Sequence, residues 1–264
     1  MSNPSKRWRA LFAGSVPKDS AYPESNEDKL RTCDDARLYV LSDGASESFN
    51  SQLWAEILVQ QASSGIPRTR FARWLKQAIA QYEERSDLAR LSWSQEAAFA
   101  RGSFASLLAV SLLDDNIEVI AIGDTVALLA SDDGISRSFP YSESEQFQQR
   151  PHLLSTLRSR HSTQFFRELL RSLIDGRGSQ KSGCLARWHY PSSHASVVIC
   201  VTDALGEWLL RKDERSHDRL KAILGVRTQE QLADLVEKAR SEDGMRRDDS
   251  SLILIGEDDD TSHT

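Results

Sequence analysis

Aspartate residues stand at the ends of several apolar runs in this sequence, where the backbone of a strand would turn. These are Asp43 after residues 38–41, Asp124 after 119–122, Asp203 after 197–201, and Asp248 just before 251–255. One aspartate in such a place usually only starts a turn. Carboxylates at the ends of neighbouring strands, however, converge on a small volume and repel each other unless a cation neutralises them. Oxygen ligands without a His or Cys cluster favour Mg²⁺ or Mn²⁺ over Zn²⁺, so the pattern indicates a site for one of these cations.

The first half of the chain predicts strands, then helices, then strands again. Aromatic and aliphatic residues predict strands at 8–16 and 36–42, with a loop between them. Apolar residues at helical spacing predict helices from Phe49 and from Phe71, and a third helix at 87–100. Residues 103–113, 117–122 and 126–130 predict an antiparallel meander.

The second half has weaker patterning. Residues 131–160 are polar and predict a long surface loop or flap. Helices are expected at 165–174, 204–211 and 229–240, and strands at 184–189, 196–201 and 251–255. Strands and helices come in clusters without strict alternation, which predicts an α+β fold of antiparallel sheets covered by helices.

Composition narrows the classes of protein. The chain has 264 residues with 39% hydrophobic and 27% charged side chains, and 33 basic against 39 acidic residues give a net charge of −6. A nucleic-acid-binding surface is therefore not expected. No apolar stretch approaches the ~20 residues of a membrane-spanning helix, and neither a signal peptide nor a membrane partner is predicted.

Domain organisation and compartment follow from the same survey. We expect one domain over residues 1–256 and an acidic, disordered tail over 257–264. The three cysteines are too few and too scattered for a disulfide framework, which favours the reducing cytoplasm.

Six short motifs appear in order and resemble those of the metal-dependent protein phosphatase 2C family, bacterial type. They are Asn26-Glu27-Asp28, SDGAS at 42–46, GSFAS at 102–106, IGDT at 122–125, VTDALGEWLL at 201–210 and MRRDDSSLILI at 245–255. The resemblance spans roughly Trp8 to Ile255. It implies a four-layer fold in which a sandwich of two antiparallel sheets is flanked by helices, with two Mn²⁺ or Mg²⁺ ions bound at one end.

The resemblance also implies roles for single residues. Asp43 would bridge the two metal ions, the Gly44 carbonyl would ligate one ion, and Asp203 and Asp248 would complete the shell of the other. Glu27 and Asp28 match the acidic pair that binds metal through water or orients the metal-bound water, which makes Asp43 and Asp28 the expected catalytic carboxylates. Asp124 matches the position that helps to hold a third ion. The implied reaction is hydrolysis of phosphoserine and phosphothreonine by a metal-activated water. The implied partner is a phosphorylated protein, either a Ser/Thr kinase or one of its targets.

Two positions depart from the family pattern. Pro23 stands where the family commonly has an arginine that grips the substrate phosphate. Lys18, the nearest upstream cation, is the candidate to bind that phosphate instead. Ala45 stands where well-studied members have a histidine proposed as the general acid. These departures leave open a second hypothesis, in which the protein is a weak or inactive pseudo-phosphatase that binds phosphoproteins or partners.

Another enzyme class can be assembled from short motifs. Ser15–Lys18 (SxxK), Ser48–Asn50 (SxN) and Lys181–Gly183 resemble the acyl-transfer motifs of penicillin-binding proteins and β-lactamases. No apolar helix follows the first motif, although that chemistry requires one. The aspartate pattern therefore favours the metal-dependent hypothesis.

Overall fold

The computed structural model describes residues 8–87, 91–161, 167, 169, 171, 184–191 and 196–257. The tail at 258–264 and most of the helix expected at 165–174 lie outside these residues. The strands are β1 (Trp8–Val16), β2 (Lys29–Cys33), β3 (Leu38–Ser42), β4 (Phe104–Ala105), β5 (Leu107–Leu112), β6 (Asn116–Ile122), β7 (Val126–Ser131), β8 (Gly134–Phe139), β9 (Leu154–Ser155), β10 (Leu185–His189), β11 (Val197–Val201) and β12 (Ser250–Glu257). The helices are α1 (Ser51–Ala62), α2 (Phe71–Arg85), α3 (Trp93–Phe99), α5 (Asp203–Leu209), α6 (Ser216–Leu224) and α7 (Gln229–Glu242), with short 3-10 turns η2 (Pro23–Ser25), η3 (Arg68–Arg70), η5 (Ser144–Gln148) and η6 (Arg158–Arg160).

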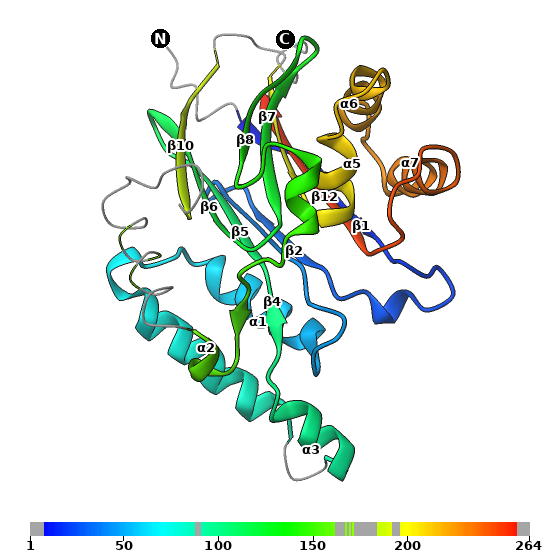
Figure 1. Cartoon of the computed structure of the whole chain (residues 1–264). Coiled ribbons are helices and arrows are strands. Elements are labelled where there is room, and N and C mark those ends of the chain that lie inside the picture. The colour runs from blue at the N-terminus through cyan, green and yellow to red at the C-terminus, as the bar shows by residue number, and fades with distance from the viewer. Residues whose placement is uncertain are drawn as a thin grey trace.

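Two antiparallel sheets form the centre of the molecule (Figure 1). In the described part of the chain each has five strands, in the orders β1-β12-β11-β7-β8 and β10-β6-β5-β3-β2. Helices α1 and α2 cover one sheet, and α5, α6 and α7 cover the other. The predicted α+β fold, a four-layer sandwich of two antiparallel sheets flanked by helices, is confirmed.

Alternation along the strands builds three apolar layers. Tyr39 and Leu41 of β3 point into the layer between the sheets, while Leu38 and Val40 point toward α1 and α2. Strand β12 repeats this pattern, since its Ile253 lies between the sheets and its neighbours face the second helical layer. A strand buried on both faces reads as a continuous apolar run. This is why β11, which leads to Asp203, is apolar throughout.

Three sequence expectations are corrected. Residues 131–160 are not one long loop, because β8 pairs with β7, and η5, β9 and η6 follow. The expected loop between the first two strands contains β2, which pairs with β3. The strand expected at 103–113 is broken at Ser106, whose hydroxyl accepts a hydrogen bond from the Asp43 backbone.

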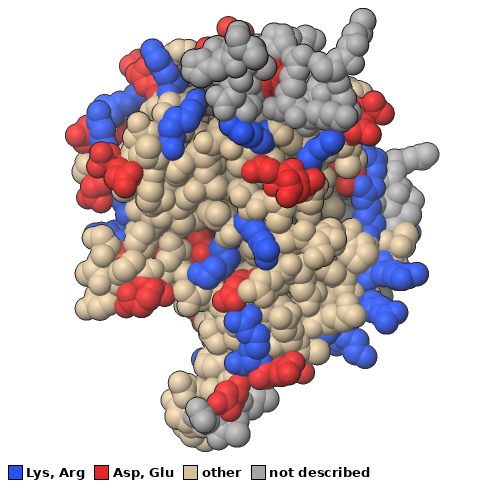
Figure 2. Space-filling view, turned by 180° about the vertical axis from the view of Figure 1, so that it is seen from behind, with Lys and Arg blue, Asp and Glu red and all other residues tan. Residues whose placement is uncertain are grey.

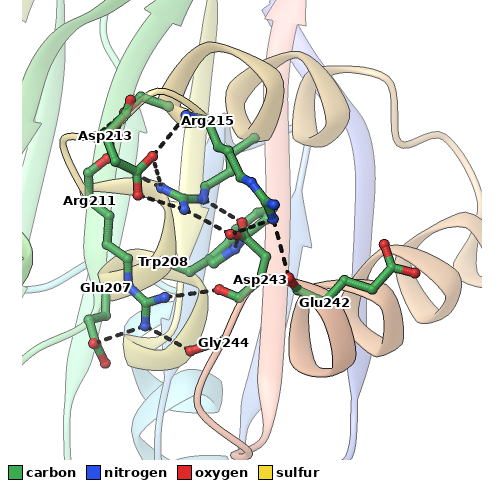
Figure 3. A network of polar contacts seen from close by, with 10 residues as sticks. Glu207, Trp208, Arg211, Asp213, Arg215, Glu242, Asp243 and Gly244 are labelled. Atoms are coloured by element: carbon green, nitrogen blue, oxygen red, sulfur yellow. Dashed lines mark hydrogen bonds and ion pairs between the residues drawn. The ribbon is translucent and has the colours of Figure 1, made fainter.

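A polar network fixes the end of α7, as Figure 3 shows. The Arg219 guanidinium is 4% exposed and pairs with Asp243 at 2.6 Å and with Asp213 at 2.8 Å. Trp208 donates to the same Asp243 carboxylate at 2.7 Å, and Arg211 donates to the Asp243 carbonyl. Trp208 of α5 and Arg219 of α6 therefore fix the position of Asp243. The segment that follows, residues 244–249, begins at this fixed residue.

The surface has no uniform charge on the face seen in Figure 2. Acidic and basic side chains are interspersed there, with Lys and Arg gathered along one edge of the view. None of the described helices has the length and apolar character needed to cross a bilayer.

Candidate metal centre

Asp43 stands one residue beyond β3, at the point where the chain leaves the sheet. Its backbone N–H donates to Ser106 Oγ at 3.0 Å, and its carbonyl accepts from the Ser106 N–H at 2.9 Å. The next residue, Gly44, forms a bridge with Ala105. A Cβ on Gly44 would lie 2.9 Å from the backbone C and O of Ser51, so only glycine fits between β3 and α1. The backbone at Asp43 and Gly44 is thus fixed between Ser106 and α1, and this fixes where the Asp43 side chain starts.

The other aspartates come from ends of neighbouring strands. Asp124 lies in the turn between β6 and β7, where Gly123 adopts a φ of +103° that favours glycine. Asp203 is the first residue of α5, directly after β11 and Thr202. Asp248 precedes β12, which pairs with β11. Strand order therefore brings together side chains as far apart in the sequence as Asp43 and Asp248, which are 205 positions apart.

These residues meet in one cavity of about 880 Å³. Its lining includes Asp43, Gly44, Asp124, Asp203 and Asp248. Basic side chains also reach it, namely Arg101, Arg150 and Arg160. The cavity therefore has an acidic centre and cations among its lining residues.

Asp28 and Glu27 lie beside this centre on the loop before β2. Asp28 is 4% exposed, and its Oδ2 accepts hydrogen bonds from the hydroxyls of Thr202 at 3.0 Å and Ser251 at 2.8 Å. Glu27 accepts from the ammonium of Lys18 at 2.9 Å and also from the hydroxyls of Ser46 and Ser51. Neither acid is among the described residues that line the cavity.

Mutual repulsion adds to burial in raising the pKa of these carboxyls. Burial raises the pKa of Asp43 well above its usual range, and the charges of Asp28 and Asp203 raise it further. Burial and the Asp203 charge raise the pKa of Asp124 to about 7. The pKa of Asp28 is also raised well above its usual value, first by burial and then by neighbouring aspartates, against the opposing effect of its hydroxyl donors. Such a cluster is destabilising unless positive charge compensates it.

The donor set suits a hard divalent cation. All of these side chains offer oxygen, which Mg²⁺ and Mn²⁺ prefer. The Oδ1 atoms of Asp28 and Asp203 are buried and accept no hydrogen bond from the described residues. Unpartnered buried carboxylate oxygens need a cation or a donor, so the residues fit a metal. As the described side chains stand, no three His, Cys, Asp or Glu residues are grouped closely enough to hold an ion.

Arg246 is one of the site residues that sequence reasoning missed. Its guanidinium donates to Asp203 Oδ2 and lies 3.8 Å from Asp248 Oδ2. Arg246 belongs to the motif at 245–255, yet nothing in its spacing indicates that it turns toward Asp203 rather than toward solvent. Thr202 and Ser251, which bind Asp28, were likewise not identified from the sequence.

The positions that depart from the family pattern are also placed. Pro23 begins η2 and is exposed, while Ala45 lines the cavity. The ammonium of Lys18 donates hydrogen bonds to Glu27 and Ser46. Lys18 is not among the described residues that line the cavity.

The fold is that of known bacterial phosphatases. No protein-family model matches the sequence, and none of the curated proteins matches it. Among solved structures, the chain is similar to the catalytic domain of the serine/threonine phosphatase PstP in complex with two manganese ions, with a TM-score of 0.55, 15% identity, and coverage of 94% of this chain and 96% of that one. It is similar to Stp1 from Staphylococcus aureus at a TM-score of 0.55 and 14% identity, covering 94% and 95%. The Mycobacterium tuberculosis phosphatase PstP/Ppp gives a TM-score of 0.52 at 15% identity, covering 95% and 97%. Over nearly its whole length, the chain has the fold of the serine/threonine phosphatase catalytic domains of the protein phosphatase 2C type.

Proposed function

We propose that this protein is a metal-dependent phosphoserine/phosphothreonine protein phosphatase. The observation that carries the proposal is the meeting of Asp43, Asp124, Asp203 and Asp248 in one cavity at the strand ends of a phosphatase fold. Four carboxylates that repel each other at one place are costly to keep unless they bind a cation.

Asp43, the Gly44 carbonyl, Asp203 and Asp248 would hold two Mn²⁺ or Mg²⁺ ions, and Asp124 a third. When bound, such ions supply a water that is nucleophilic near neutral pH and positive charge that offsets the phosphoryl oxygens. Asp28 and Glu27 would orient water at the edge of this cluster. The two manganese ions in the PstP structure support the choice of metal.

The chain's own residues define what the substrate meets. The arginines that line the cavity are Arg101, Arg150 and Arg160. Since Pro23 carries no charge and Lys18 is paired with Glu27, these arginines would attract the substrate phosphate instead. The substrate would be a phosphorylated protein, namely a Ser/Thr kinase or one of its targets. We place this protein in the cytoplasm, because its three cysteines are too scattered for the disulfide framework of a secreted chain.

A second candidate is the pseudo-phosphatase, a module that binds phosphoproteins without turnover. The observation that favours it is the ion pair of Arg246 with Asp203, because this pair already compensates a carboxylate that the reaction needs for metal. Ala45 in the cavity also favours the pseudo-phosphatase, because its side chain cannot donate a proton to a leaving group.

Phosphate release separates the two candidates. We would measure it from a phosphothreonine peptide and an aryl phosphate with Mn²⁺, Mg²⁺ or EDTA, using Asp203→Asn as the control protein. Turnover that requires metal and is lost in Asp203→Asn supports the phosphatase. Mn²⁺ binding without turnover of either substrate supports the pseudo-phosphatase.

A further inference from the structure

The Asp203–Asp248 pair already has a cation between its carboxylates, and that cation belongs to the protein. Arg246 Nη2 donates to Asp203 Oδ2 and is 3.8 Å from Asp248 Oδ2. Asp248 Oδ1 accepts the Asp249 N–H at 3.0 Å, while Asp203 Oδ1 is buried without a hydrogen bond from the described residues. The guanidinium therefore bridges one oxygen from each carboxylate, which is the position that a shared cation would take.

Neighbouring basic side chains make other contacts. The Lys18 ammonium binds Glu27, Arg247 Nε donates to the Lys18 carbonyl at 3.0 Å, and Arg240 donates to the backbone carbonyls of Pro17 and Asp248. Among the described residues, Arg246 is thus the basic side chain that pairs with the Asp203 carboxylate. Without it, Asp203 would keep a partly buried negative charge beside Asp248 and Asp124.

Arg246 can also leave this position. Its side chain is 40% exposed, whereas the Asp203 side chain is 15% exposed, so the guanidinium approaches the cluster from the solvent side. Among the described residues, Asp203 is the one that accepts a hydrogen bond from the Arg246 side chain. A short outward rotation would return the guanidinium to water, where hydration of its charge offsets part of the cost of losing the ion pair. The segment that carries it is fixed at Asp243, so the movement requires no refolding of α7.

We propose that Arg246 is an internal counter-ion that competes with a divalent cation for Asp203 and Asp248, and that cation binding displaces its guanidinium from the cluster. The inference rests on the metal site of the proposed function. Only the fraction of molecules with Arg246 displaced can bind metal there, so the apparent affinity is the intrinsic affinity multiplied by that fraction. Arg246 therefore stabilises the metal-free protein and sets the concentration of metal at which the site fills.

Manganese binding to the full chain tests this directly. Isothermal titration calorimetry and electron paramagnetic resonance of free Mn²⁺ would compare wild type, Arg246→Ala and Arg247→Ala. Arg247→Ala is the matched control. It removes the same charge at the neighbouring position, and the Arg247 side chain bonds to a backbone carbonyl rather than to Asp203. We expect Arg246→Ala to bind Mn²⁺ about tenfold more tightly, equivalent to ~1.4 kcal/mol, and Arg247→Ala to bind like wild type.

Thermal unfolding supplies a readout without turnover. Arg246→Ala should melt at a lower temperature than wild type in EDTA and show a larger increase on addition of Mn²⁺. Equal or weaker Mn²⁺ binding by Arg246→Ala overturns the inference, as does an equal gain in affinity in both arginine variants, because that gain would reflect net charge alone.

Phosphate release measured on the same proteins keeps the two claims apart. Tighter Mn²⁺ binding by Arg246→Ala with no turnover in any variant supports the counter-ion and contradicts the phosphatase. Turnover by wild type with equal Mn²⁺ affinities contradicts the counter-ion and supports the phosphatase. Absence of Mn²⁺ binding by every variant overturns both.

Discussion

Asp28 and Ser251 lie 223 positions apart in the sequence, and the Ser251 hydroxyl donates a hydrogen bond of 2.8 Å to Asp28 Oδ2. The Thr202 hydroxyl donates to the same oxygen, which leaves Asp28 Oδ1 buried without a hydrogen bond from the described residues. Only one of the two carboxylate oxygens of Asp28 therefore accepts hydrogen bonds from the described residues. Oδ2 is held by the hydroxyls of Thr202 and Ser251, and Oδ1 can bind a cation.

Asp28→Asn should stabilise the metal-free protein by about 1–2 kcal/mol, because the amide oxygen keeps both hydroxyl bonds while a buried negative charge is removed. The increase in melting temperature on addition of Mn²⁺ should shrink in the same variant. Both effects are measured by thermal unfolding in EDTA and in Mn²⁺.

Asp249→Asn is the matched control for this change. Asp249 is equally buried, but its two oxygens accept backbone N–H groups of Lys18 at 2.7 Å and Glu27 at 2.8 Å. An amide there would place N–H against N–H, so Asp249→Asn should destabilise the protein by about 1–2 kcal/mol. If both variants were destabilised alike, Asp28 would be an ordinary buried hydrogen-bonding residue.

Asp243→Asn should lower the free energy of unfolding by about 3 kcal/mol. It leaves the Arg219 side chain, which is 4% exposed, with a weakened partner. Hydrogen bonding from Arg219 holds the pKa of the Asp243 carboxyl well below its usual range, so the pair is intact at neutral pH. Urea unfolding measures the loss.

Glu143→Gln provides the comparison, since its ion pair with Lys212 at 3.2 Å joins two exposed side chains. That variant should change the free energy of unfolding by less than about 0.5 kcal/mol. Losses of similar size in both variants would contradict the view that burial decides the effect.

His161 should make stability depend on pH in the acid range. Burial lowers the pKa of His161 to about 4, and its Nε2 accepts a hydrogen bond of 3.0 Å from the Ser155 N–H, so the folded state holds it neutral. The unfolded state takes up a proton near pH 6.5. Its contribution to stability is therefore constant above about pH 6.5 and is lost as pH falls from there toward 4.

His161→Gln isolates this effect, because the amide oxygen can still accept from Ser155 and does not titrate. In urea unfolding with EDTA, wild type should lose stability relative to His161→Gln by up to about 3 kcal/mol between pH 7 and pH 4. Parallel pH curves for the two proteins would show that His161 keeps its ordinary pKa.

Substrate chemistry provides a test of Ala45. An alkoxide leaving group needs a proton donor, whereas an aryl oxide needs less help. Ala45 lines the cavity and supplies no proton. Under the proposed phosphatase function, kcat should be lower on a phosphothreonine peptide than on an aryl phosphate, and Ala45→His should raise the peptide rate selectively, by roughly tenfold. Comparable rates on both substrates, unchanged in Ala45→His, would contradict this.

The sequence by itself determined the layers and the strand-end aspartates. Alternating apolar residues such as Leu38 and Tyr39 face opposite sides of a strand because successive side chains point in opposite directions. The alternation of side chains along any strand is enough to predict this. Asp43 and Asp203 could be picked out for the same reason, since each follows an apolar run.

Only the tertiary structure decided which groups meet. Strand β2 carries five residues that are half-buried or exposed, and its pairing with β3 gives no strong local signal. The contact of Arg246 with Asp203 joins residues 43 positions apart, and that of Thr202 with Asp28 joins residues 174 apart. Such contacts depend on strand order and on the path of the loop after α7, whereas sequence periodicity reports only which face of its own element a residue occupies.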